Sequence, residues 1–214
     1  MNRTANIIGA SGLVGQQLLT QLLNHPRYIK VRSFVRRPFG MSHPKLEEII
    51  IDFDHPDSWS VLVQGEALFS TLGTTLKTAG SKENQYRVDY TYQYEFAKAA
   101  AQNGVGAYLL VSSMGANARS SVFYSRIKGE LEEAVAKLPF RKCLIFRPSI
   151  LEGNRQEKRP GEKMGLTVTH FITRFMMKKY RPMPVSLLAE KMIKLSVDPA
   201  IGLRTIENDE IFTL

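Results

Sequence analysis

Apolar runs and amphipathic segments alternate along the first three quarters of this 214-residue chain. Short runs rich in Ile, Val, Leu and Phe are typical of strands, and they occur at 6–8, 31–35, 48–53, 67–72, 108–111 and 143–146. Apolar residues at helical spacing lie between them, at 14–23, 56–63, 90–102 and 124–137. Continuously apolar strands indicate a parallel sheet buried on both faces. The pattern therefore predicts a doubly wound α/β (Rossmann) fold with helices on both faces of the sheet.

The pattern changes after Pro148. Residues 152–165 are polar, charged and rich in Gly and Pro, which predicts a loop. Apolar residues return at helical spacing at 171–176 and 187–195. We expect small helices here that cover one end of the sheet. Residues 1–214 would then form a single domain, in which 150–200 contribute a small helical lid, a C-terminal lobe that covers the substrate.

Composition narrows the class of protein. No apolar stretch approaches the roughly 20 residues of a transmembrane helix, so we expect no membrane span. The N-terminus has no apolar signal-peptide region, and the single Cys143 excludes an internal disulfide. These features predict a cytoplasmic protein. The four histidines are scattered and form no cluster with Cys or Asp, so we expect no metal site.

The formal net charge of +9 raises the question of nucleic acid. Eight basic and two acidic residues lie between Arg155 and Arg181. A basic surface can bind polyanions, but it can equally be a solvated face or border a site for a phosphorylated cofactor. The chain has no set of zinc ligands and no aromatic signature of RNA binding. We therefore do not expect nucleic acid to be its main partner.

Three glycines follow the first predicted strand, in IIGASGLVGQQLL. The spacing GxxGxxG between a strand and a helix indicates dinucleotide binding, although a plain strand-to-helix turn is the alternative. Glycine allows the backbone to approach a pyrophosphate closely, and the helix N-terminus adds free N–H groups and partial positive charge. We expect this loop to bind the cofactor through Gly9, Ser11, Gly12, Leu13, Val14 and Gly15.

The end of the second strand bears on the choice of cofactor. An NAD site normally has an acidic residue there, about 20 residues after the loop, but this strand ends in Arg36 and Arg37 and no acid occurs before Glu47. Two arginines suit a 2′-phosphate, so we expect NADP(H) in preference to NAD(H). The alternative is a pair of exposed arginines on a loop. Asp52 and Phe53, at the end of the third strand, would lie near the adenine.

A second group of candidate residues follows the fifth predicted strand. Tyr124 and Lys128 are four positions apart, which puts them on one face of a helix. A nearby ammonium stabilises tyrosinate and makes a tyrosine a usable acid or base near neutral pH. Ser112 and Ser113, at the end of a strand, are both candidates to hold a substrate oxygen. An ordinary surface pair is the alternative, but the order of these elements favours catalysis.

These motifs resemble those of the short-chain dehydrogenase/reductase superfamily, in its extended and atypical branch. The resemblance covers most of the chain and rests on GASGLVG (9–15), VSSMGA (111–116) and YSRIKGELE (124–132). The run FRPSILEGNRQEKRPGE (146–162) is similar to the small subgroup that includes the human Tat-interactive protein. The resemblance implies Tyr124 as the acid/base, Lys128 as its partner and Ser113 as the third member. It implies further cofactor contacts from Tyr124, Lys128, Thr71, Leu72, Gly73, Thr74, Pro148 and Ile150.

The combined hypothesis is an NADPH-dependent oxidoreductase that acts on a small carbonyl or alcohol substrate, as a monomer or a homodimer. The alternative is a regulatory or scaffold protein that binds NADP(H) without turnover. A complete Ser–Tyr–Lys set favours the enzyme.

Overall fold

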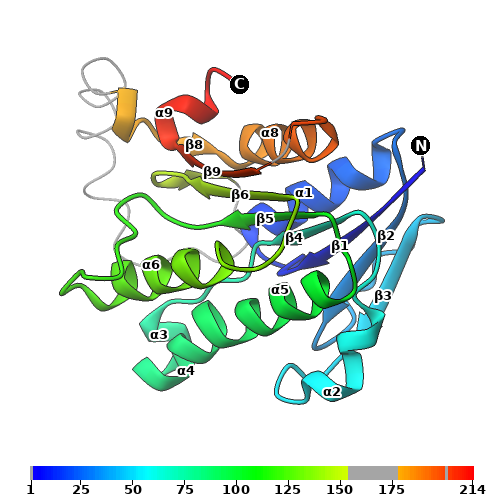
Figure 1. Cartoon of the computed structure of the whole chain (residues 1–214), viewed down its shortest axis with the longest axis horizontal. Helices are drawn as coiled ribbons and strands as arrows, with labels where there is room; N and C mark the ends of the chain where they lie inside the picture. The colour runs from blue at the N-terminus through cyan, green and yellow to red at the C-terminus, as the bar shows by residue number, and fades with distance from the viewer. Residues whose placement is uncertain (1, 154–177, 201) are drawn as a thin grey trace.

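A computed structural model describes residues 2–153, 178–200 and 202–214. Its main sheet has the strand order β3-β2-β1-β4-β5-β6-β9, and all neighbouring strands are parallel (Figure 1). The strands are β1 (Arg3–Ile8), β2 (Tyr28–Val35), β3 (Leu46–Ile50), β4 (Ala67–Ser70), β5 (Ala107–Val111), β6 (Lys142–Arg147) and β9 (Gly202–Glu207). The chain winds outward from β1 to β3, returns to β4 and winds outward again. The predicted doubly wound parallel sheet is confirmed.

Helices cover both faces of the sheet (Figure 1). One face carries α1 (Leu13–Asn24) and α8 (Val185–Val197), and the other carries α5 (Tyr92–Gln102) and α6 (Phe123–Val135). The shorter elements are α2 (Pro56–Trp59), η1 (Ser60–Leu62), α3 (Leu76–Ala79), α4 (Lys82–Tyr86), the π-helical η2 (Arg87–Thr91), β7 (Leu151–Glu152), η3 (Lys178–Tyr180), β8 (Met183–Pro184) and α9 (Asn208–Ile211).

Each face of the sheet has its own apolar core. Leu18 of α1 and Leu188 of α8 are fully buried in the first core. In the second, Trp59 stacks on Phe96 with ring centroids 3.9 Å apart. Between the two cores, β4 and β5 are buried at every residue. Burying each large apolar side chain contributes about 1.5–3 kcal/mol, so both faces are committed to stability and ligands are left to the loops at the sheet edge.

The edge strand β9 was not predicted from the sequence. Its first four residues are exposed, and Ile206 is its buried anchor. A strand with a single buried apolar residue shows neither a continuous apolar run nor clear alternation. Its position depends on pairing with β6, in a register that runs from Lys142↔Gly202 to Arg147↔Glu207.

The predicted lid is described only in part. The helix expected at 187–195 forms as α8, but it packs beside α1 on a face of the sheet. The helix expected at 171–176 and most of the loop expected at 152–165 lie outside the described residues. Parallel pairing of β7 with β8 brings residues 151–152 next to 183–184. Among the helices that the structure describes, none is long and apolar enough to cross a membrane.

The loop between β1 and α1 is packed so closely that two of its positions exclude a side chain. Gly9 has φ +83°, and a Cβ there would lie 2.6 Å from the backbone nitrogen of Leu72. At Gly15, in the first turn of α1, a Cβ would overlap the carbonyl oxygen of Gly9 and lie 2.8 Å from Cα of Ala10. These contacts hold the N-terminus of α1 against the ends of β1 and β4.

We predict that Gly15→Ala destabilises the fold by about 3 kcal/mol, at the upper end of the usual cost of overpacking, because the added methyl group meets backbone that cannot rotate away. Urea denaturation measures the change. Gln17→Ala, at an exposed position of the same helix, is the matched control and should change stability by less than about 0.5 kcal/mol. Equal stability of the two variants would contradict the close packing of this loop.

Candidate active site

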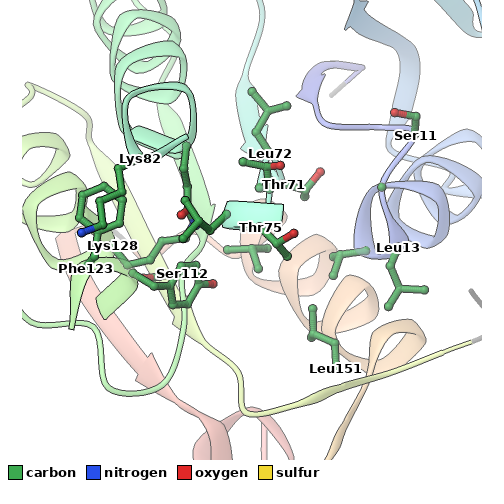
Figure 2. A pocket seen from close by; sticks show the side chains of 18 of the residues that line it. Ser11, Leu13, Thr71, Leu72, Thr75, Lys82, Ser112, Phe123, Lys128 and Leu151 are labelled. Atoms are coloured by element: carbon green, nitrogen blue, oxygen red, sulfur yellow. The ribbon is translucent and has the colours of Figure 1, made fainter. Parts of the chain in front are cut away.

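Two adjoining hollows lie at the carboxyl edge of the sheet, with volumes of about 940 and 400 Å³. They share the glycine loop and residues 71–74, which follow β4. The strand order reverses between β1 and β4, and ligands of open α/β sheets bind at such a point. Figure 2 shows the larger hollow, with Ser11 and Leu13 on one side and Lys82 and Phe123 on the other.

The helix α1 begins in the wall of both hollows without a side-chain cap. Its N-cap is Gly12, and its first turn contains no acidic residue. The backbone N–H groups of this turn therefore have no side-chain acceptor. A hydrogen bond from Gly12 N to Gly9 O, 2.9 Å long, closes the loop beneath them. Free N–H groups and the helix dipole together suit an anion.

The segment after β4 forms the wall opposite the glycine loop. Thr71 donates hydrogen bonds to the carbonyl oxygen of Ile8 from its backbone nitrogen, at 3.0 Å, and from its hydroxyl, at 2.9 Å. These bonds join the ends of β4 and β1. All four residues that the resemblance implicates in this segment line both hollows, namely Thr71, Leu72, Gly73 and Thr74.

The smaller hollow is bordered by cationic and polar side chains. Arg36, which follows β2, lines it, and so do Asn84 and Arg87 from α4 and η2. Arg37 is exposed and is not part of this lining. Arg87 was not predicted from the sequence, because the sequence alone does not distinguish a charged helical residue that lines a ligand site from one on a solvent-exposed face.

The residues expected near the adenine lie outside this lining. Phe53 is buried in the second core, with its ring 5.2 Å from that of Tyr92. Asp52 is exposed, and its carboxylate accepts a hydrogen bond from the backbone nitrogen of Asp54. Tyr92 instead lines the smaller hollow and donates to the Asp54 carboxylate at 2.9 Å.

Tyr124 and Lys128 both line the larger hollow. Their spacing on α6 brings the Lys128 Nζ to 5.9 Å from the centre of the Tyr124 ring. The Tyr124 side chain is 39% exposed, whereas Lys128 is 2% exposed. A phenol thus faces the ligand space, with an ammonium buried behind it.

The sequence analysis missed the partner of Lys128. Asp89 is fully buried, and its carboxylate lies 2.9 Å from the Lys128 Nζ. It also accepts a 3.3 Å hydrogen bond from the backbone nitrogen of Thr74. Asp89 belongs to the π-helical turn η2, and such turns are frequent at functional sites. The sequence offered one sign of a buried charge here, because Asp89 lies among apolar and aromatic residues of a helical segment.

Burial alone lowers the pKa of the Lys128 ammonium, because it removes water from the charged form. Burial is the largest single influence, but Asp89, Tyr124 and Glu132 together outweigh it, with Asp89 contributing most, and the net effect raises the pKa of Lys128 above its usual value. Lys128 is therefore a cation at neutral pH, compensated by a buried anion.

The two candidate serines have different surroundings. Ser112 is 5% exposed, lines the larger hollow and donates a 2.5 Å hydrogen bond to the carboxylate of Glu132. Arg147 binds the same carboxylate with its guanidinium, through bonds of 2.5–3.2 Å. Ser113 donates to the carbonyl oxygen of Met114 at 3.3 Å and is not among the lining residues.

Pro148 and Ile150, which follow β6 and were expected to contact the cofactor, do not line either hollow. The carbonyl oxygen of Pro148 accepts a 2.9 Å hydrogen bond from Met114 N, which ties the segment after β6 to the loop after β5. Ile150 is 59% exposed, and its neighbour Leu151 lines the larger hollow. No group of three His, Cys, Asp or Glu side chains in the described parts of the chain could hold a metal ion.

Residues 9–138 match a family model described as NAD(P)H-binding. This range includes the glycine loop and residues 71–74, which line both hollows. The chain belongs to this NAD(P)H-binding family. Among its relatives is protein fmp52-1, mitochondrial, of Aspergillus terreus, which is 33% identical over 95% of this chain and 88% of the relative. Protein fmp52, mitochondrial, of Aspergillus fumigatus is 40% identical over 73% of this chain and 70% of the relative.

Solved structures with the same fold extend the comparison beyond these fungal relatives. The Bordetella bronchiseptica enzyme WbmH, in complex with NAD+, has a TM-score of 0.74 at 16% identity, over 97% of this chain and 76% of its own. UDP-glucose 4-epimerase of Thermotoga maritima, with UDP-glucose, has a TM-score of 0.70 at 13% identity, over 96% of this chain and 77% of its own. At these identities the likeness shows the fold, and the expected membership of an NAD(P)H-binding family is confirmed by the family model.

The relatives correct the expected cellular location. The fungal relatives carry the word mitochondrial in their names, so the prediction of a cytoplasmic protein was wrong. That prediction depended on the lack of a recognisable apolar signal sequence, and such a sequence is only one of several ways to direct a protein to a compartment.

We predict that Asp89→Asn costs about 3–5 kcal/mol of stability at pH 7, because it leaves the Lys128 ammonium buried without its anion. With Asp89 removed, burial is the main influence left, and it disfavours the protonated amine in the folded state. The unfolded state then binds more protons, so the variant regains stability as pH rises toward the usual lysine pKa of 10.5. In the wild type the pKa of Lys128 is raised, so the change of stability with pH has the opposite sign. The ion pair stabilises the fold at neutral pH, and this stabilisation is lost only as pH rises above 10.5.

Urea denaturation between pH 7 and 10 measures both effects. The double variant Asp89→Asn, Lys128→Met removes the unpaired charge and should be more stable than Asp89→Asn alone. Asp57→Asn, at an exposed position, is the control and should cost less than about 1 kcal/mol. A pH-independent cost of Asp89→Asn would show that the ion pair does not act in this way.

Proposed function

We propose that this protein is an NADP(H)-dependent oxidoreductase that reduces a carbonyl group or oxidises the corresponding alcohol. The observation that carries the proposal is one continuous ligand space, in which the uncapped start of α1 and the Tyr124–Lys128 pair line the same hollow. A dinucleotide needs the first feature for its pyrophosphate, and carbonyl reduction needs the second for a proton.

At the cofactor end, the pyrophosphate would lie on the N–H groups at the start of α1. The adenosine would extend into the smaller hollow, where Arg36 and Arg87 supply two guanidinium groups. Guanidinium groups bind phosphates through paired, charge-assisted hydrogen bonds, which favours the 2′-phosphate of NADP(H) over the free hydroxyl of NAD(H).

At the reacting end, bound NADPH would supply a hydride to the carbonyl carbon, and Tyr124 would give a proton to the carbonyl oxygen. In the opposite direction Tyr124 takes the proton from the alcohol. Lys128 carries three N–H donors, and its pairing with Asp89 at 2.9 Å leaves donors for the hydroxyl groups of the nicotinamide ribose. Lys128 thus holds the cofactor next to Tyr124, while Asp89 fixes the ammonium.

Ser112 has the better position of the two serines for contact with a ligand. A carboxylate paired with arginine only accepts hydrogen bonds, so the Ser112 hydroxyl must donate to Glu132. Toward the hollow the Ser112 oxygen can then only accept. It would orient the Tyr124 phenol or a substrate hydroxyl rather than donate to a carbonyl oxygen.

Cofactor binding and preference are tested by thermal shift with NADPH, NADP+, NADH and NAD+. A ligand at about 100 times its dissociation constant should stabilise the fold by about 2.7 kcal/mol. We expect the largest shifts with NADPH and NADP+, and Arg36→Ala should remove the difference between the phosphorylated and unphosphorylated cofactors. Arg37→Ala, outside the lining, should have the smaller effect. Equal shifts with all four cofactors would contradict the NADP(H) preference, and no shift would contradict dinucleotide binding.

Tyr124→Phe tests the proton transfer. Loss of a general acid usually costs between 10² and 10⁴ in rate, so we expect turnover of a carbonyl compound to fall at least 100-fold while the thermal shift with NADPH persists. Nicotinamide absorbance follows the reaction. Tyr94→Phe, on α5 and outside both linings, should keep wild-type turnover. Full activity of Tyr124→Phe would exclude this mechanism.

A further inference from the structure

Lys82 is a cation that lines the larger hollow with Tyr124, and it has no role in the proposed hydride and proton transfer. Lys82, the first residue of α4, lines this hollow together with Tyr124 and Lys128. Its Nζ lies 5.5 Å from the centre of the Phe123 ring, which neighbours Tyr124 in the chain. A cation near an aromatic ring is weakly attracted to it, which favours a side-chain position close to the site.

The charges around the ligand space are unbalanced. In the described part of the chain, neither hollow has an acidic lining residue, whereas Arg36, Arg87, Lys82 and Lys128 line one or the other. Lys128 is compensated by Asp89, and Arg87 lies 3.9 Å from the carboxylate of Asp54, which leaves Arg36 and Lys82 without an acidic ion-pair partner among the described residues. A cavity lined by one sign of charge attracts ligands of the opposite sign, so the ligands of this site are anions.

The phosphates of the proposed cofactor do not account for Lys82. The pyrophosphate would lie at the start of α1, and the 2′-phosphate beside Arg36. Figure 2 shows Ser11 and Leu13, which mark the start of α1, on the opposite side of the larger hollow from Lys82 and Phe123. The charge of Lys82 is therefore available to the second ligand, the substrate.

Exposed apolar side chains line the same hollow as Lys82. Leu76 is 47% exposed and Val122 is 60% exposed, and both line the same hollow with Phe123. Large apolar side chains left exposed around a cavity mark a binding surface for an apolar group. The larger hollow thus combines the Lys82 cation with a water-exposed apolar surface.

We propose that the substrate is an apolar aldehyde or ketone that carries a carboxylate, and that Lys82 binds this carboxylate. The inference rests on the proposed function and adds the class of substrate. The apolar part would pack on Leu76, Val122 and Phe123, and the carbonyl would meet Tyr124. The hydride of NADPH forms the new C–H bond, the C=O double bond becomes single, and the oxygen takes the Tyr124 proton. The carboxylate takes no part in the reaction.

The first experiment measures binding without turnover. Benzoate and its neutral analogue benzamide are titrated into the NADP+-saturated protein by isothermal calorimetry, with the wild type, Lys82→Gln, Lys82→Arg and Lys77→Gln. Lys77 is an exposed lysine on the neighbouring α3 and lines neither hollow. We expect benzoate to bind about tenfold more tightly than benzamide wherever the charge at position 82 is kept. That preference should be lost in Lys82→Gln, because a hydrogen bond to a charged group is replaced by one to a neutral group.

The second experiment measures turnover with NADPH and a matched pair, 4-carboxybenzaldehyde and methyl 4-formylbenzoate. The ratio of kcat/KM for the acid over the ester should fall about tenfold in Lys82→Gln and stay near the wild-type ratio in Lys82→Arg and Lys77→Gln. Higher salt should lower the wild-type ratio as well.

The outcomes separate the two proposals. Equal binding of benzoate and benzamide by the wild type, or a preference for benzoate that survives in Lys82→Gln, overturns the role of Lys82 and leaves the oxidoreductase proposal intact. Failure of all four nicotinamide cofactors to stabilise the protein, or full activity of Tyr124→Phe, overturns the proposed function itself.

Discussion

A carboxylate and an ammonium buried together, Asp89 and Lys128, hold the reacting end of this molecule in one arrangement. Neither charge can remain buried without the other, so η2 and α6 must pack directly against each other beside the larger hollow. The π-helical turn makes this possible, and it is held in turn by Gln93, whose amide donates to the Asp89 carbonyl oxygen at 3.0 Å. Ser70, at the end of β4, donates to the same amide at 2.7 Å. The pair is thus connected to the centre of the sheet.

The two ends of the site are built by different means. The cofactor end consists mainly of backbone, with the glycine loop, the free N–H groups of α1 and the segment after β4. The reacting end consists of side chains from α4, η2 and α6, with Ser112 held by Glu132 and Arg147. Backbone presents the same groups to every dinucleotide, whereas side chains can change with the substrate. This division explains how one fold can bind a common cofactor and still serve different reactions.

Motifs with a local cause could be predicted from the sequence. The spacing of Gly9 and Gly15 reports a turn in which a Cβ would meet backbone, and the spacing of Tyr124 and Lys128 reports one face of a helix. Contacts between distant segments could not be predicted in this way. Asp89 joins Lys128 across 39 positions of the chain, and no periodicity within either helix indicates the pairing. The contacts of Ser112 have the same character, because its hydroxyl donates to Glu132 of α6, which Arg147 of β6 also binds.

The amino-acid sequence by itself determined the doubly wound sheet, the tight glycine loop before α1 and the position of Tyr124 and Lys128 on one face of a helix, because each follows from apolar periodicity or from residues a few positions apart. Only the tertiary structure decided which charges are compensated and which face the ligand. Lys128 and Lys82 are chemically the same residue in the sequence, and folding buries the first against Asp89 while leaving the second at the edge of the larger hollow. The physical reason is that the energy of a charge depends on its burial and its neighbours, and both are set by segments far apart in the chain.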